Sequence, residues 1–557
     1  MQIINPLSMK KAFWSLVLVW CIGSTHAQQK ITPTTTLSLQ RPKLVVGLVV
    51  DQMRWDYLFR YYNRFGEAGF KRLLNEGFSC DNTQIPYAAT VTAPGHTTVY
   101  TGSIPAIHGI TENDFIIQST GKSMYCVADS SVQSIGGSVK AGKMSPRTLL
   151  TTTVTDELKI ATNSRSKVIG IALKDRGAIL PAGHMADAAY WFDDVSGNWI
   201  SSTFYMKDLP QWLKNFNAQK LPEKYLSQDW NTLYPIETYT ASLPDSNSYE
   251  RKIKGTEAPI FPIKTSQLFS KDLGVIRTTP FGNTLTLDLA KAIISNEEMG
   301  IDSETDFLAV SCSSTDYVGH DFGPKSIEVE DTFLRLDKDL ASFFTFLDNR
   351  VGKGNYTLFL TADHGGAEVA QFLKDRKIPA GIWPEKEISK RLSAQLEKEF
   401  GHQNLTLSLD NYQVSLNTNL IKSVGLDEAA VRKSCVEFLK RQQGVEYVLD
   451  MKNPEQESIP AIIKTRLINS YHPDRSGAIF VVLNPGWYHS SDVTGTTHGS
   501  WNPYDSHIPL LLMGWGIKKG KTNRSIYMTD IAPTISTLLH IQMPNGAVGT
   551  PITEALK

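Results

Sequence analysis

Several Asp and His residues, far apart in the chain, each come soon after a run of apolar residues. Continuous apolar runs are typical of buried parallel strands, and the ligands of open α/β sheets bind beyond the carboxyl ends of such strands. Six oxygen and nitrogen donors at one sheet edge would be enough for two divalent metals. With the run that each follows, the residues are Asp51 (KLVVGLVV), Asp316 and His320 (FLAVSCSST), Asp363 and His364 (YTLFLTA) and His498 (GAIFVVLNPGWY).

Apolar runs alternate with segments of helical periodicity along most of the chain, which predicts an α/β fold. We expect a mostly parallel central sheet flanked by helices on both faces. The predicted strands are 43–51, 167–173, 306–313, 356–362, 477–484 and 507–514. The predicted helices are 65–76, 151–164, 326–350, 386–400, 426–443 and 527–540. Regions 185–285 and 366–476 interrupt the alternation. Because both follow candidate site strands, we interpret them as insertions over the active-site edge.

The chain has 557 residues, with 56 basic and 56 acidic side chains. Because the net charge is zero, nothing favours nucleic acid as a partner. The N-terminus has the pattern of a secretory signal, in which Lys10 and Lys11 precede an apolar stretch and cleavage follows Ala27. That stretch is short for a membrane span, and no second candidate follows. We therefore expect a signal peptide at 1–27 and one exported, periplasmic domain at 28–557, monomeric and without stable membrane insertion.

Four cysteines remain after removal of the predicted signal. An exported protein can form disulfides. Cys80 and Cys126 flank the segment that contains Thr92, so a bridge between them would brace that segment. We expect Cys312 and Cys435 to be buried free thiols.

Residues 90–102, TVTAPGHTTVYTG, predict a loop that runs into a helix. Thr92 is a good N-cap, and Pro94 suits the first turn. An anion can sit against the backbone N–H of Ala93 at such a helix start, with the Thr92 hydroxyl facing it. A Thr hydroxyl is a weak nucleophile until its pKa falls. Taken alone, this segment favours a simple cap, and the metal ligands must decide the role of Thr92.

The spacing of the candidate ligands is compatible with a metal site. Asp316 and His320 are four residues apart, so one helical turn would place both on the same face. Asp363 and His364 are adjacent, and both can face one site only if the strand has already ended. The Gly-Gly pair that follows them favours such an ending. Two adjacent metals in turn suggest phosphoryl-type chemistry.

Long ordered motifs show that the sequence resembles the alkaline phosphatase superfamily, and within it the periplasmic PafA-type enzymes that use a threonine nucleophile. The resemblance covers nearly all of the chain after the predicted signal. It is carried by VVDQMRWDYL (49–58), NTQIPYAATVTAPGHTTVYTGSIPAIHGITENDF (82–115), ALKDRGA (172–178), STDYVGHDFGP (314–324), TADHGG (361–366) and GTTHGSWNPYDSHIPLLLMG (495–514).

The resemblance implies two zinc ions. It assigns one to Asp316, His320 and His498, with an open position, and the other to Asp51, Asp363, His364 and the Thr92 oxygen. Mixed His and carboxylate ligation with an open position is typical of catalytic zinc. The other histidines, His96, His108, His472, His489 and His507, are expected to make hydrogen bonds without contacting metal.

The resemblance also implies the substrate contacts. Asn113 would donate to a phosphoryl oxygen beside the Ala93 N–H. Lys174 and Arg176 would contact the additional charged oxygen of a phosphate monoester, because alternate residues on an extended chain point the same way. Without the resemblance, KDR at this position is explained by a solvated pair bridged by Asp175.

The expected function is therefore broad zinc-dependent hydrolysis of small phosphate monoesters through a phosphothreonine intermediate. The alternative is a phosphodiesterase or nucleotide pyrophosphatase on the same scaffold, since such enzymes share the nucleophile and the metal ligands but lack the Lys/Arg pair. A third reading, of a different class, is a non-catalytic periplasmic protein that binds zinc or phosphate.

Overall fold

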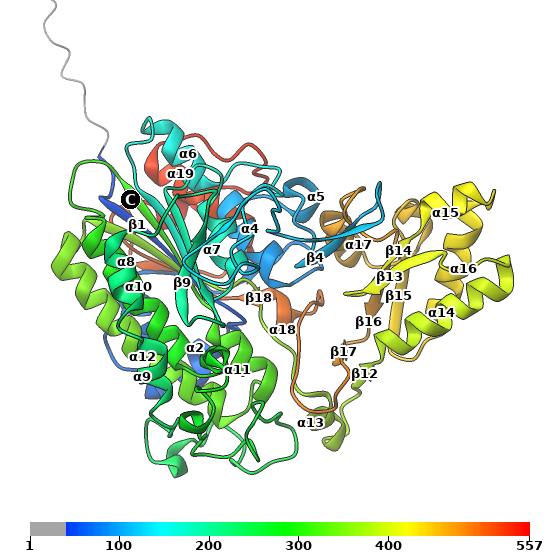
Figure 1. The fold of residues 1–557 in the computed structure, drawn as a ribbon, viewed down its shortest axis with the longest axis horizontal. Helices are drawn as coiled ribbons and strands as arrows, with labels where there is room; N and C mark the ends of the chain where they lie inside the picture. Colours follow the sequence, from blue (N-terminus) through cyan, green and yellow to red (C-terminus); the bar gives the residue numbers. More distant parts are fainter. Residues whose placement is uncertain (1–39) are drawn as a thin grey trace, which may run out of the picture. The chain divides into compact units, whose positions relative to one another are not determined.

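The apolar run before Asp51 forms strand β1 (Leu44–Val50), and all of its residues are buried. On one side β1 pairs in parallel with β11 (Tyr356–Thr361), and on the other with β10 (Asp306–Cys312). The computed structural model in Figure 1 describes residues 40–557. The predicted signal peptide, 1–27, lies outside the described residues. Within 40–557 no helix combines the length and the apolar content needed to cross a membrane.

These strands belong to a ten-stranded sheet whose central strands, from β11 to β8, are all parallel. Antiparallel pairs occur toward the two edges, so the sheet is mixed around a parallel centre. The strand order is β20 (Gly520–Thr522), β2 (Phe78–Cys80), β19 (Leu510–Gly514), β11, β1, β10, β7 (Val168–Ala172), β8 (Ala188–Asp193), β9 (Asn198–Ser202) and β6 (Ser134–Ile135).

Two groups of helices flank this sheet (Figure 1), as predicted. One group contains α10 (Phe281–Asn296), α11 (Ser314–Phe322) and α12 (Ile327–Leu347), which contact one another and β10 through α10. The other contains α4 (Thr92–Thr101), α6 (Val154–Ala161), α7 (Asp175–Ala182) and α19 (Ile531–Leu539), of which α7 lies against β7 and β8. The other predicted helices are also present, as α3 (Phe70–Glu76), α14 (Glu385–Phe400) and α16 (Glu428–Lys440).

A second, smaller sheet has its own apolar core together with α14 and α16. Its order is β13 (Thr406–Asp410), β14 (Gln413–Leu416), β16 (Ile479–Leu483) and β15 (Val445–Asp450). The sequence had suggested that the run before His498 is a strand of the central sheet. This expectation is wrong, because the run forms β16 of the smaller sheet. The region also extends past residue 476. Periodicity identifies a buried strand but not the sheet that it joins.

Two further expectations are wrong. Strands β8 and β9 lie inside region 185–285 but pair within the central sheet, so its first part is no insertion. Cys80 ends β2, and Cys126 follows β5 (Lys122–Tyr125). Both are buried free thiols, because flanking the same segment in sequence does not bring two cysteines together in space. Cys312 and Cys435 are buried free thiols, as predicted.

Candidate active site

Parallel register brings the carboxyl ends of four strands to the same edge. Val50 of β1 lies beside Cys312 of β10, and Ser311 beside Ala172 of β7. On the other side, Val49 lies beside Thr361, the last residue of β11. The residues that follow these strand ends are Asp51 after β1, Asp316 after β10, Lys174 after β7, and Asp363 and His364 after β11.

One group of possible metal ligands consists of Asp51, Asp363 and His364, whose donor atoms all lie within 4.8 Å of one another. All three side chains are fully buried. Asp51 Oδ1, Asp363 Oδ2 and His364 Nε2 have no hydrogen-bond partner in the described chain. The other ring nitrogen of His364 bonds the carbonyl of Gly365 at 2.9 Å, so Nε2 is the atom that faces the carboxylates. These donors fit a bound dication, because buried polar atoms otherwise find partners.

A second group contains Asp316 and His498, again with His364, within the same 4.8 Å limit. His320 is outside that group of three but places Nε2 3.3 Å from Asp316 Oδ1, one turn away on α11. His498 Nε2 lies 3.4 Å from the same oxygen. The Nδ1 atoms of both rings contact backbone carbonyls, those of Thr496 and Thr90, which leaves Nε2 to face the site.

The buried charges of the site strongly affect one another. Burial and the neighbouring Asp363 raise the pKa of Asp51 well above its usual range, and this outweighs the opposing effect of Lys174. Burial also raises the pKa of Asp316, but Lys174 and His320 outweigh it and hold that pKa well below the usual range. Burial lowers the pKa of His364 to about 3, so its ring is neutral, as metal ligation requires.

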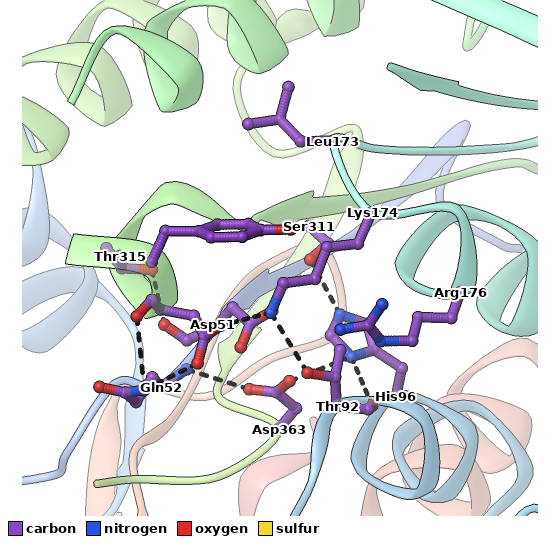
Figure 2. Close-up of polar contacts among 12 residues, drawn as sticks. Asp51, Gln52, Thr92, His96, Leu173, Lys174, Arg176, Ser311, Thr315 and Asp363 are labelled. Carbon is purple, nitrogen blue, oxygen red and sulfur yellow. Dashed lines mark hydrogen bonds and ion pairs between the residues drawn. The ribbon is translucent and has the colours of Figure 1, made fainter. Parts of the chain in front are cut away.

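Lys174 lies at the centre of this arrangement (Figure 2). Its Nζ is 2.7 Å from Asp51, 2.6 Å from Asp316 and 3.2 Å from Thr92 Oγ1. Only 3% of the residue is exposed. The solvated pair bridged by Asp175 is therefore wrong for Lys174, which binds carboxylates inside the protein.

Arg176 differs from the expected extended arrangement. Lys174 is the N-cap of α7, and Arg176 lies within the first turn of that helix. The two residues are therefore not alternate positions of one strand. Arg176 Nη1 donates to Tyr125 Oη at 3.2 Å, while its Nε is buried without a partner in the described chain. Figure 2 shows both side chains extending from the start of α7.

Thr92 is the first residue of α4, and its side chain is buried. The N-cap is Val91, so the prediction that Thr92 caps the helix is wrong by one position. As a result, the Thr92 hydroxyl is not used to cap the helix and is free to face Lys174. The Ala93 N–H donates to Asn113 Oδ1 at 3.0 Å, which places the Asn113 amide beside the start of α4.

His96 was expected to make hydrogen bonds near the site, whereas Gln52 and Tyr317 were not expected to contact its residues. His96 Nδ1 lies 3.2 Å from Asp363 Oδ2, and its Nε2 contacts Ser311 Oγ at 2.8 Å. The Lys174 ammonium lies over the Tyr317 ring, 5.1 Å from its centre. Gln52 contacts two of the candidate ligands. Gln52 and Tyr317 directly follow the candidate ligands Asp51 and Asp316 in the sequence motifs. Their residue types alone do not predict these contacts.

A cavity of about 460 Å³ lies beside His320. Its lining includes residues from distant parts of the chain: Arg251, Glu385, Lys386, His489, Thr496 and Thr497. This lining carries charged side chains of both signs. The cavity therefore leaves space beside His320 for part of a small-molecule ligand.

Comparison with known proteins shows the family of this chain. A protein from Myroides odoratus named calcium-transporting ATPase is 56% identical over 93% of this chain and 95% of its own length. Alkaline phosphatase PhoV from Synechococcus elongatus is 52% identical over 98% of each chain. Alkaline phosphatase PafA from Elizabethkingia meningoseptica is 50% identical over 96% of this chain and 98% of its own. The chain belongs to the alkaline phosphatase superfamily.

Two further findings support the alkaline phosphatase fold. The crystal structure of wild-type alkaline phosphatase PafA matches with a TM-score of 0.92 at 51% identity, covering 93% of this chain and 100% of that one. Residues 45–505 match the family of type I phosphodiesterases and nucleotide pyrophosphatases. The α/β architecture with a large central mixed sheet is therefore that of alkaline phosphatases, as the sequence motifs predicted.

Proposed function

We propose that this protein is an exported, zinc-dependent phosphomonoesterase with broad specificity that works through a phosphothreonine intermediate. The observation that carries the proposal is the position of Thr92. Its hydroxyl lies at a helix start, 3.2 Å from a buried ammonium, beside two groups of candidate metal-binding donors. The relatives named alkaline phosphatases support the reaction class.

The donor set fits two zinc ions. Asp51, Asp363 and His364 would hold one together with the Thr92 oxygen, and Asp316, His320 and His498 the other. His364 also lies within 4.8 Å of the second group, so the two sites are close neighbours. When bound, the ions would supply positive charge to the attacking, leaving and phosphoryl oxygens.

The chain's own residues can then perform the reaction in two steps. Thr92 Oγ1 attacks phosphorus, a bond forms between them, the bond to the leaving alcohol breaks, and the proton lost by the Thr92 hydroxyl ends on that alcohol. Water then attacks the phosphothreonine and releases inorganic phosphate and the Thr92 hydroxyl. Lys174 would stabilise negative charge on the Thr92 oxygen, while the Asn113 amide and Arg176 would donate to phosphoryl oxygens.

The substrate choice depends on Lys174 and Arg176. A phosphate monoester carries a second negative charge at alkaline pH, whereas a diester carries one. A buried ammonium and a guanidinium with an unpaired Nε favour the more highly charged ester. The match to type I phosphodiesterases makes diester hydrolysis the alternative function.

The test compares a nitrophenyl phosphate with its methyl ester in wild type and in Lys174→Ala/Arg176→Ala. Loss of one well-placed donor costs roughly 10²–10³ in rate. The double variant should lose at least about that factor on the monoester and much less on the diester. Lys433→Ala, an exposed change, is the control. Equal losses on both esters, or a faster wild-type rate on the diester, would overturn the monoesterase proposal.

Zinc dependence and export have separate tests. Chelation should abolish turnover, and zinc should restore it at two ions per chain by elemental analysis. We also propose that the chain is periplasmic after loss of residues 1–27, and monomeric. Cell fractionation with N-terminal sequencing would check export, and light scattering of the purified protein would check the monomer.

A further inference from the structure

Gln52, directly after Asp51, has an unusual backbone conformation. Its φ is +62°, in the left-handed region that side chains other than glycine rarely adopt. Only 5% of the residue is exposed. Strained backbone of this kind persists when surrounding contacts hold it, and it gathers at functional sites. The contacts of Gln52 therefore indicate what the strain serves.

Gln52 contacts one carboxylate from each group of candidate ligands. Its backbone N–H donates to Asp363 Oδ1 at 3.1 Å, and its side-chain Nε2 donates to Asp316 Oδ1 at 2.7 Å. Figure 2 shows Gln52 near Asp51, with dashed contacts that include the one to Asp363. Lys174 also joins the two groups, through Asp51 and Asp316, whereas Gln52 joins Asp363 to Asp316.

The surrounding chain holds the amide in one place. A Cβ on Gly319 of α11 would overlap Gln52 Oε1, and one on Gly366 would lie 3.0 Å from the same atom. The amide is thus held between α11 and the loop after β11, close to both groups. The bond to Asp316 engages the same oxygen, Oδ1, that His320 and His498 face. It therefore limits rotation of that carboxylate.

We propose that Gln52 is a positioning residue that orients Asp316 relative to Asp363 and so sets the geometry of the paired metal sites. The inference rests on the proposed zinc enzyme. Partners that orient a metal ligand typically change metal affinity by about 10–100-fold when removed. Because the backbone N–H to Asp363 survives any side-chain change, only the Asp316 side of the pair should respond.

The test uses two variants that lose the amide in different ways. Gln52→Met keeps the length of the side chain and the backbone strain but removes the donor. Gln52→Gly removes the side chain and suits the positive φ. Gln403→Met, at an exposed position, is the control. Zinc-loaded full-length proteins are titrated with a chromophoric chelator, and zinc loss is followed together with kcat and KM.

Both variants should lose one of the two zinc ions about 10–100-fold more readily, with the other ion within about threefold of wild type. kcat should fall more than KM changes. Wild-type affinity for both ions in Gln52→Met, or equal weakening of both ions, would overturn the positioning role. If wild type itself does not bind two zinc ions, the proposed function fails instead, so the two failures are distinguishable.

Discussion

The ammonium of Lys174 lies 2.6 Å from a carboxylate oxygen of Asp316, and both residues are buried. Lys174 also contacts Asp51 at 2.7 Å, so one cation lies against two buried carboxyl groups. Removing one partner of a buried ion pair costs about 3–5 kcal/mol, because the remaining charge has no compensation. Bound metal would supply the missing positive charge.

We therefore expect Lys174→Ala to lower the free energy of unfolding by about 3–5 kcal/mol in zinc-free protein and by clearly less in zinc-loaded protein. Denaturant unfolding of wild type and variant, with and without chelator, measures both values. Lys433→Ala, whose side chain is exposed, should change neither. An equal loss in both states would show that Lys174 does not share its role with metal.

The Thr92 hydroxyl is the proposed point of covalent attachment. Removing a nucleophile typically costs roughly 10⁴–10⁶ in rate. Thr92→Ala should lose about this much activity, whereas Thr92→Ser should keep part of it. Acid quenching of wild type during turnover, followed by peptide mass spectrometry, should find phosphate on Thr92.

The matched control is Thr101→Ala, at the other end of α4, which should keep its activity and its label. Phosphate on a different residue, or substantial activity in Thr92→Ala, would contradict the covalent mechanism.

Glu328 and Glu250 make stability depend on pH. The side chains of Glu328 and Glu250 are both buried. Neither Oε atom of Glu328 has a hydrogen-bond partner in the described chain. Burial raises the pKa of Glu250 to about 8, and burial together with Glu250 raises the pKa of Glu328 well above its usual range. The folded state thus holds protons that the unfolded state releases near pH 4.5.

The contribution of these protonated carboxyl groups to the free energy of unfolding should therefore be complete below about pH 4.5. It should fall as pH rises toward about 8, by at most about 5 kcal/mol for Glu250. Glu328→Gln, which removes one titrating group, should flatten this decline in a series of denaturant titrations from pH 5 to 9. Glu257→Gln, at an exposed position, should keep the wild-type slope. An unchanged slope in Glu328→Gln would rule out its contribution.

Gly47 of β1 sets how closely α4 approaches the sheet. A Cβ at this position would overlap the hydroxyl of Tyr100 in α4 and lie 2.6 Å from the Phe359 ring of β11. Overpacking of a dense core costs about 1–3 kcal/mol. Gly47→Ala should lower stability by that amount and also reduce kcat, since α4 carries Thr92. Gly66→Ala, where the nearest atom is 3.4 Å away, is the control for thermal unfolding and kinetics.

The apolar runs alone were enough to predict the central strands and the polar residues at their ends. β1, β10 and β11 appear where the continuous apolar runs predicted them, because a strand covered on both faces must be apolar throughout. The four-residue spacing of Asp316 and His320 likewise predicted one helical face. The long motifs predicted the alkaline phosphatase family, which the relatives confirm.

Other features depended on contacts between distant segments, which no local pattern encodes. β16 has the composition of a central strand but joins the smaller sheet, and Cys80 and Cys126 do not pair. Lys174 lies in a sequence typical of a surface, yet its ammonium is buried between two carboxylates. Local sequence determines whether a segment is helix or strand and which face is apolar. Only the tertiary structure decides which buried charges meet, because that depends on the register of strands far apart in the chain.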